Sequence, residues 1–231
     1  MKQLMRYRII SGRTTEVRDV LMEARTGRRE RGARKGKSSP AQQKRNEGEA
    51  VLALARQLNC NCKGGDLFLS LKYSDRRLPE AKRLAKNFMR RIARAYRKET
   101  GSKLVWFLVT ADRSAKTGEP VRLHHHVVMQ AMDWEAIARH WPPEEFSYRR
   151  LDASGDYTAV ARYMIQNAGY GGGRAWSHAL GIRQPRYTAP IPVTRAGTVR
   201  IPAGGPGGLR NRLQRVVHTV GGASAGRGTV I

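Results

Sequence analysis

Three consecutive histidines, His124 to His126, lie in the segment VRLHHHVVMQ, whose alternating residue types are typical of a β-strand. Successive side chains of a strand point to opposite faces, so His124 and His126 share one face while His125 lies on the other. The other residues of the His125 face are apolar, and we expect that face to pack against helices. Two imidazoles at this spacing can converge on one metal ion, so the strand predicts a metal site at His124 and His126.

A two-histidine site needs a third ligand from a neighbouring strand. Asp112, at the end of the apolar run KLVWFLVTAD, is the best-placed candidate, and Glu119 is the reserve. Carboxylate, imidazole and water ligands suit Mg²⁺ or Mn²⁺, with zinc left open. The alternative interpretation is a chance run of histidines or a pH-sensitive surface without a metal.

Tyr163 is the candidate nucleophile. The segment DYTAVARYMIQNA predicts a helix with one apolar stripe, which consists of Tyr157, Val160, Ala161, Met164 and Ala168. Tyr163 falls outside this stripe, on a face near Gln166, so its hydroxyl can reach a ligand, whereas Tyr157 belongs to the core. A phenol has a pKa near 10, so its attack on a phosphodiester would need a metal to polarise the phosphate. The alternative role for Tyr163 is packing.

The charge of the chain points to a polyanionic partner. Its 231 residues include 44 Lys and Arg against 18 Asp and Glu, which gives a formal net charge of +26. Nucleic acid is the expected partner, and a solubilising surface or an RNA-coating, ribosome-type protein are the alternatives. An anionic membrane is the weaker rival, because no apolar run approaches the ~20 residues that span a bilayer. We therefore expect a cytoplasmic protein without a membrane partner.

The order of the predicted elements indicates an α+β domain. Strands are expected at 66–74, 103–110, 121–130 and 146–151, with helices at 78–98, 134–140 and 156–168. The simplest arrangement of this order is an antiparallel sheet with its helices packed mainly on one face. A further helix is expected after SSP, with Ser38 or Ser39 as its N-cap and Pro40 in its first turn.

Composition divides the chain into three stretches. Residues 1–40 are predicted to be a flexible basic arm, because the run RTGRRERGARKGK lacks apolar residues. Residues 41–187 are predicted to be the folded domain, and 188–231 a Gly- and Arg-rich tail. Contacts to DNA are expected from the basic face of the 78–98 helix and from polar residues near the histidines and the tyrosine. These predicted contact residues are Lys72, Lys82, Arg83, Lys86, Arg90, Arg94, Arg122, Arg162, Gln166 and Arg174. For the helix face, a solvated surface is an equally good interpretation.

The segments LHHHVVM and RYMIQN resemble the His-hydrophobe-His motif and the tyrosine helix of the HUH endonucleases, with His125 at the middle position. GDLFLSLKYS with PEAKRLAKNFMRRIARAYRK is similar to the first strand and helix of phage and plasmid rolling-circle replication initiators. GGGRAWSHALGIRQP is similar to the segment after their tyrosine helix, so the resemblance covers roughly 40–187. Gln166 stands where members often have a lysine.

The resemblance implies a ferredoxin-like sheet and a single-tyrosine nickase. It implies His124 and His126 as metal ligands and Tyr163 as the nucleophile that forms a 5′-phosphotyrosine link and frees a 3′-hydroxyl. The substrate would be single-stranded DNA at a replication origin, with a host helicase and polymerase as partners and a phage or plasmid as carrier of the gene. The alternatives are a relaxase or transposase with the same chemistry, a non-catalytic nucleic-acid-binding protein with a degenerate HUH domain, and a zinc-stabilised basic module.

Overall fold

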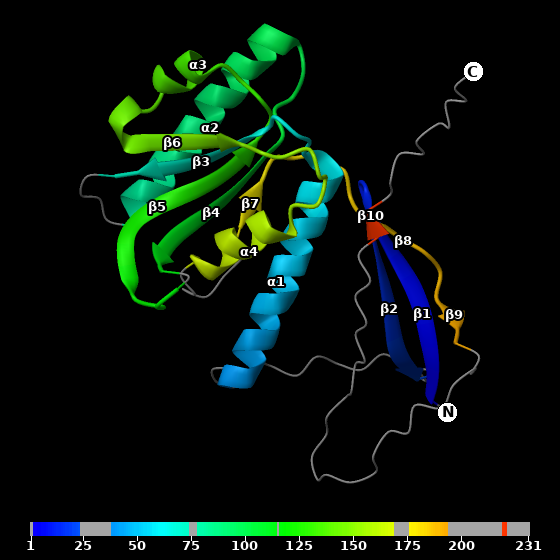
Figure 1. Ribbon diagram of the computed structural model, residues 1–231. Coiled ribbons are helices and arrows are strands. Elements are labelled where there is room, and N and C mark those ends of the chain that lie inside the picture. The colour runs from blue at the N-terminus through cyan, green and yellow to red at the C-terminus, as the bar shows by residue number, and fades with distance from the viewer. Residues whose placement is uncertain are drawn as a thin grey trace, which may run out of the picture. The chain divides into compact units, whose positions relative to one another are not determined.

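The computed structural model describes residues 2–23, 38–73, 78–114, 116–168, 176–193 and 219–220 of the chain. The chain divides into two units, a larger one, Ser38–Gln184, and a smaller one in which Met1–Lys37 joins Pro185–Ile231 (Figure 1). The larger unit coincides closely with the domain predicted at 41–187.

The larger unit is an α+β domain, as predicted. In chain order it contains α1 (Pro40–Asn61), β3 (Leu67–Lys72), α2 (Leu78–Thr100), β4 (Trp106–Arg113), β5 (Pro120–Met129), α3 (Trp134–Ala138), a 3₁₀ turn (Pro143–Glu145), β6 (Phe146–Arg150), α4 (Thr158–Gln166) and β7 (Ser177–His178). Its strands form one antiparallel sheet in the order β6-β3-β5-β4-β7. The histidine strand β5 therefore lies in the middle of the sheet, with β3 and β4 as its neighbours.

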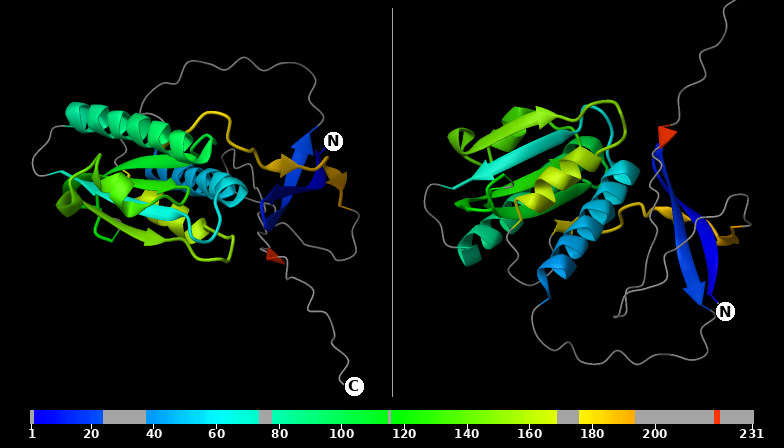
Figure 2. Two further views of the ribbon diagram at one scale, coloured as in Figure 1. Left: turned by 90° about the horizontal axis from the view of Figure 1, so that it is seen from above. Right: turned by 60° about the horizontal axis from the view of Figure 1, so that its bottom comes forward.

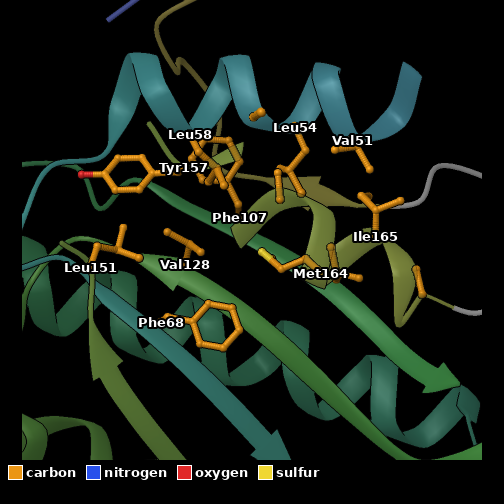
Figure 3. Close-up of a cluster of buried hydrophobic side chains, with 14 of the residues drawn as sticks. Val51, Leu54, Leu58, Phe68, Phe107, Val128, Leu151, Tyr157, Met164 and Ile165 are labelled. Carbon is orange, nitrogen blue, oxygen red and sulfur yellow. The ribbon is translucent and has the colours of Figure 1, made fainter. Parts of the chain in front are cut away.

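Both faces of this sheet are covered by helices, which corrects the prediction of helices mainly on one face (Figures 1 and 2). On one face Phe68 and Val128 join the buried side chains of α1 and α4, a core shown in Figure 3. On the opposite face Leu69 and Val127 join those of α2 and α3. The cause is that β3 and β5 carry large apolar residues at consecutive positions, so neither face of these strands can be left in water.

The two long helices of the larger unit have clear sequence signals. Ser39 caps α1, since its side chain accepts a hydrogen bond from the Gln42 amide at 3.3 Å, and Pro40 occupies the first helical position. In α2 the apolar positions are buried against the sheet and the basic positions are exposed. Within the described part of the chain, no helix is both long and apolar enough to cross a membrane.

The first residues of the chain form a β-hairpin, so the predicted flexible arm at 1–40 is wrong for residues 2–23. Strand β1 (Lys2–Ser11) pairs antiparallel with β2 (Thr14–Glu23) along its whole length. Gly12 opens the two-residue turn with a φ of 58°, the conformation that glycine adopts at the first position of a type II′ turn. The basic composition of residues 25–37 suggested an arm, and that whole run lies outside the described residues.

Residues from the end of the predicted domain and from the predicted tail complete the sheet of the smaller unit. Strands β8 (Arg186–Tyr187) and β9 (Ile191–Pro192) pair with β1, and β10 (Thr219–Val220) pairs with β2. Tyr187 stacks on Tyr7 with ring centres 6.5 Å apart. The described residues of 188–231 therefore include sheet strands, while the glycine-rich remainder of the tail lies outside the described chain.

Candidate metal and tyrosine site

Strand β5 directs its histidines to opposite faces of the sheet, as the alternation predicted. His126 stacks on Phe68 with ring centres 5.3 Å apart, on the face that α1 and α4 cover. His125 meets Tyr73 edge to face at 5.5 Å, on the face that α2 and α3 cover. His124 lies beside His126, with ring centres 4.7 Å apart. The pair His124 and His126 is thus separated from His125 by the sheet itself.

The two paired histidines point their Nε2 atoms at each other, 3.1 Å apart. Nδ1 of His124 lies 2.8 Å from the Arg122 carbonyl oxygen, which only accepts, so this nitrogen carries the proton and Nε2 has a free lone pair. Nδ1 of His126 lies 3.2 Å from the Ser70 hydroxyl oxygen, which can accept a hydrogen bond from a protonated Nδ1 in the same way. In that tautomer both Nε2 lone pairs face one point, as metal-binding histidines held by outer hydrogen bonds do.

Burial keeps His126 neutral. Its side chain is 1% exposed, and this burial, together with the positive charges of His124, His125 and Arg149, lowers its pKa to about 3. At neutral pH the imidazole therefore holds one proton and one lone pair. A neutral imidazole is the form that binds a metal.

The nitrogen geometry fits a metal ion, but the described residues supply only two of its ligands. Two ligand nitrogens at ~2.1 Å from one metal and at right angles around it lie about 3.0 Å apart, close to the separation of the His124 and His126 Nε2 atoms. Within the described ranges, no three His, Cys, Asp or Glu side chains are grouped to hold one ion. The remaining positions would fall to water or to the phosphate of a substrate.

Asp112, the predicted third ligand, is not brought into such a group. Ala111 pairs in register with His124, and Asp112 follows in the bulge between Ala111 and Arg113. Its amide donates to the Asn167 carbonyl at 3.2 Å, while its Oδ1 atom is buried without a hydrogen-bond partner. The reserve ligand Glu119 is exposed in the turn before β5. The burial of the Asp112 Oδ1 atom without a hydrogen bond is therefore a feature that the sequence does not explain.

Tyr163 on α4 lies beside the histidine pair. Its ring centre is 5.0 Å from that of His126 and 6.0 Å from that of Phe68. The side chain is 44% exposed, although it packs on two buried rings. Helix α4 thus holds the phenol over the face of the sheet that carries His124 and His126, which we call the site face. The phenol stays open to a ligand there.

Tyr157 has the structural role that its place in the apolar stripe predicted. It is 1% exposed, its hydroxyl donates to the Asp152 carbonyl, and its amide donates to the Asn59 side chain at 2.8 Å. Figure 3 shows its ring among the buried side chains of α1 and α4. Tyr157 therefore anchors the start of α4, while Tyr163, on another face of the same helix, is available for chemistry.

Several predicted DNA contacts lie on the site face. Lys72 pairs in register with His124 and is exposed, and Arg162 and Gln166 are exposed on α4, next to Tyr163 and one turn after it. Arg122, also predicted, directs its Nε to the Tyr73 carbonyl. Arg174 falls outside the described residues, as does Tyr170, the next tyrosine after α4.

The basic residues of α2 do not join this site. Helix α2 packs on the His125 face, whereas Tyr163 and His126 lie with α1 and α4 on the other face. The predicted contact residues that lie on α2 are all exposed, and they are Lys82, Arg83, Lys86, Arg90 and Arg94. A contact of this helix with the DNA backbone stays a prediction, but it would lie on the opposite face of the sheet from His126 and Tyr163.

Two residues that the sequence analysis missed complete the site. Phe68 packs against both His126 and Tyr163, which also contact each other. Arg149 on β6 pairs in register with Phe68 and places its guanidinium 4.8 Å from the centre of the Phe68 ring. The available signal was the alternation of FSYRR, which puts Arg149 and Ser147 on the same face of that strand. Arg149 gives the site an exposed cation. Its planar guanidinium is a group that can bind a phosphate through two parallel hydrogen bonds.

Comparison with known proteins adds no family to this picture, because no family model, curated protein or solved structure matches the chain.

Proposed function

We propose that the larger unit is a metal-assisted nickase of single-stranded DNA, of the HUH type, and that Tyr163 is its nucleophile. The observation that carries the proposal is the 5.0 Å separation between the Tyr163 and His126 rings, with the tyrosine still 44% exposed. An accessible phenol beside two imidazoles with converging Nε2 atoms supplies both a nucleophile and a metal site.

The proposed reaction is a transesterification at phosphorus. The Tyr163 hydroxyl loses its proton to water or to a neighbouring base, and its oxygen forms a new bond to the phosphorus atom. The bond from phosphorus to the 3′ oxygen of the preceding nucleotide breaks, and that oxygen takes up a proton as a free 3′-hydroxyl. The 5′ end stays linked to Tyr163, so the energy of the phosphodiester is kept for rejoining.

Each group near Tyr163 has a part in this scheme. A divalent ion held by His124 and His126, Mg²⁺ or Mn²⁺, would supply positive charge at the phosphate. Ser70 and the Arg122 carbonyl hold the two imidazoles in the tautomer that leaves both lone pairs free. The exposed tyrosine ring offers a stacking surface, which single-stranded DNA uses and a duplex does not.

The wider role that we propose is initiation of rolling-circle replication. The antiparallel α+β sheet is compatible with the ferredoxin-like arrangement that the resemblance implied. The proposal includes an origin on a phage or plasmid, a host helicase and polymerase as partners, and action in the cytoplasm. Transfer or transposition by a relaxase or transposase would use the same nicking chemistry.

A non-catalytic nucleic-acid-binding protein is the second candidate. It is favoured by one observation, that Asp112 does not join His124 and His126 in a three-ligand group within the described chain. Under this alternative the histidines would be packing residues and the excess positive charge would carry the binding. Binding would then be steeply salt-dependent and unchanged by chelation of metal.

Detection of a covalent protein-DNA adduct on a denaturing gel tests the proposal. Wild-type protein is incubated with Mn²⁺ and single-stranded oligonucleotides drawn from the neighbourhood of its own gene. We expect an adduct in the wild type and in Tyr148→Phe, an exposed tyrosine of β6 that serves as the matched control. Tyr163→Phe and the double variant His124→Ala/His126→Ala should give none.

The other outcomes are equally informative. An adduct that persists in Tyr163→Phe would keep the enzyme class and move the nucleophile, with Tyr170 to be tested next. No adduct on any oligonucleotide, together with tight binding in EDTA, would favour the non-catalytic binding protein.

A further inference from the structure

The outer face of α2 is a second charged surface, separate from the tyrosine site. We call it the α2 basic face and define it by the exposed cations Lys82, Arg83, Lys86, Arg90, Arg91, Arg94, Arg97 and Lys98. At 1.5 Å per residue these cations span about 24 Å along the helix axis. The exposed acidic residues of α2 lie near its ends, Glu80 at 3.8 Å from Arg83 and Glu99 in the last turn. The middle of the face is therefore uniformly positive.

The sheet separates this face from Tyr163. The buried side of α2, with Phe88 and Ile92, packs on the same face of the sheet as His125. Tyr163 packs with His126 on the opposite face. The sheet thus lies between the two surfaces, and nucleic acid bound at Tyr163 and at the α2 basic face would belong to different segments.

The two surfaces also differ in what they offer a ligand. The site face combines cations with the rings of Phe68, His126 and Tyr163, a combination that suits unstacked bases. The aromatic residues of α2 are Phe88, which is buried, and Tyr96, which packs against the core, so its outer face provides charge without rings. A surface of this kind binds phosphate groups and is attracted most strongly where they are most densely spaced. The density is greatest in a DNA duplex, which carries one negative charge per ~1.7 Å of its axis.

We infer that the α2 basic face binds the backbone of duplex DNA next to the single-stranded segment on which Tyr163 acts. The identity of the polyanion as DNA rests on the proposed function, whereas the separation of the two surfaces does not. The protein then holds a junction, with the duplex on the α2 side of the sheet and the single strand on the α4 side.

Salt titrations of duplex and single-strand binding test this inference. The full-length protein carries Tyr163→Phe and is kept in EDTA, so that no cleavage occurs, and fluorescence anisotropy follows a short duplex and a single strand of the same sequence. The test variant adds Lys86→Gln, Arg90→Gln and Arg94→Gln, which keep a good helix former at each position. The matched control adds Lys44→Gln, Arg45→Gln and Lys116→Gln, three exposed cations from other parts of the larger unit.

For the duplex, we expect the test variant to lower the slope of log K against log salt by up to about 2.7, since each lost phosphate contact contributes about 0.9. Duplex Kd should rise at least tenfold more than in the control variant, and single-strand Kd should change no more than in the control. Circular dichroism of both variants verifies that α2 is intact.

Two results would overturn the inference. Equal slope changes in the test and control variants would mean that only net charge matters. An equal loss of single-strand and duplex binding in the test variant would mean that α2 serves a single strand. Adduct formation is measured separately, with protein that retains Tyr163. If no adduct forms but the duplex slopes change as expected, the proposed nickase activity is contradicted and the proposed duplex-binding surface stands.

Discussion

The guanidinium of Arg149 lies 4.8 Å from the centre of the Phe68 ring, and the same ring stacks on His126. This contact fixes an exposed cation on the face of the sheet where Tyr163 lies, although β6 is an edge strand. Arg149 is close enough for its charge to contribute to the low pKa of His126.

Replacing Arg149 should weaken the hold on single-stranded DNA. In protein that carries Tyr163→Phe, we expect Arg149→Ala to raise the Kd for a single strand at least about tenfold, because hydrogen bonds to a charged partner contribute about 1.5–3 kcal/mol. Arg149→Lys should recover only part of this loss, since lysine keeps the charge without the planar fork. Fluorescence anisotropy at fixed salt measures the difference.

The neighbouring Arg150 is the control for this experiment. It alternates to the other face of β6 and directs a guanidinium nitrogen to the Gly65 carbonyl at 3.3 Å. Arg150→Lys should leave single-strand binding within twofold of the parent protein. A similar loss for Arg149→Lys and Arg150→Lys would argue against a specific contact at Arg149.

Ser70 should act on metal affinity through His126. Its hydroxyl lies 3.2 Å from Nδ1 of that histidine, and removal of such outer hydrogen bonds lowers metal affinity by about 10–100-fold. We therefore expect Ser70→Ala to weaken Mn²⁺ binding by at least tenfold in isothermal titration calorimetry. His124→Ala should abolish it.

Ser147 provides a matched serine. It pairs in register with Ser70 on the same face of the sheet, but it is exposed on the edge strand. Ser147→Ala should keep the wild-type affinity for Mn²⁺. Wild-type affinity in Ser70→Ala as well would show that Ser70 does not orient a metal ligand.

His125 should make the fold sensitive to acid. Burial, with smaller effects of the charges of His124 and Lys82, lowers its pKa to about 4 against the opposing effect of the Ala81 carbonyl. The unfolded chain binds this proton near pH 6.5 and the folded chain only near pH 4, so stability falls as the pH drops through this window. The cost at the acid end is roughly 3 kcal/mol for this residue.

Urea unfolding in EDTA between pH 7 and pH 4 measures this effect. His125→Phe removes the titrating group and retains an aromatic ring against Tyr73, so its unfolding free energy should vary less with pH than that of the wild type. The variant keeps the acid sensitivity due to His126, whose pKa is also lowered. Parallel pH profiles for variant and wild type would contradict the assignment to His125.

Gly64 should tolerate no side chain. A Cβ atom there would lie 2.9 Å from the Ala153 Cα and 3.1 Å from the Asp152 carbonyl oxygen, which are backbone atoms of the loop before α4. We expect Gly64→Ala to destabilise the larger unit by about 1–3 kcal/mol in chemical unfolding, because the loop must move away. Since this loop leads into the tyrosine helix, adduct formation should fall as well.

Gly48→Ala is the opposite case. Gly48 lies inside α1, and a Cβ there would meet no described atom within 4 Å apart from the two adjacent residues and the backbone of its own helix, so alanine should stabilise the helix by up to about 1 kcal/mol. A destabilised Gly48→Ala, or an unaffected Gly64→Ala, would contradict this account of the two glycines.

Local periodicity explains which parts of the fold the sequence could predict. The facing of His124 and His126 follows from the two-residue repeat of a strand, and the exposure of Tyr163 follows from the helical repeat. The prediction of helices mainly on one face rested on the order of the elements, whereas the consecutive apolar residues Val127, Val128 and Met129 indicate a strand covered on both faces.

The missed features depend on contacts between distant segments. Asp112 was predicted as a ligand from its place at the end of an apolar run, and that run gave no sign of the bulge after Ala111. Arg149 reaches the site only because β6 pairs with β3, and strand order cannot be read from one sequence. The hairpin around Gly12 was obscured because the basic run that follows β2 dominated the composition of the first 40 residues.

The smaller unit is built from both ends of the chain, with the larger unit inserted between β2 and β8. During synthesis the ribosome releases all of Ser38–Gln184 before the strands that pair with β1 on its other side exist. The larger unit can therefore fold while translation continues, whereas the first hairpin waits for its last partners. A premature stop near Gln184 would leave the tyrosine site encoded in full and the edge of β1 open to pairing with other chains.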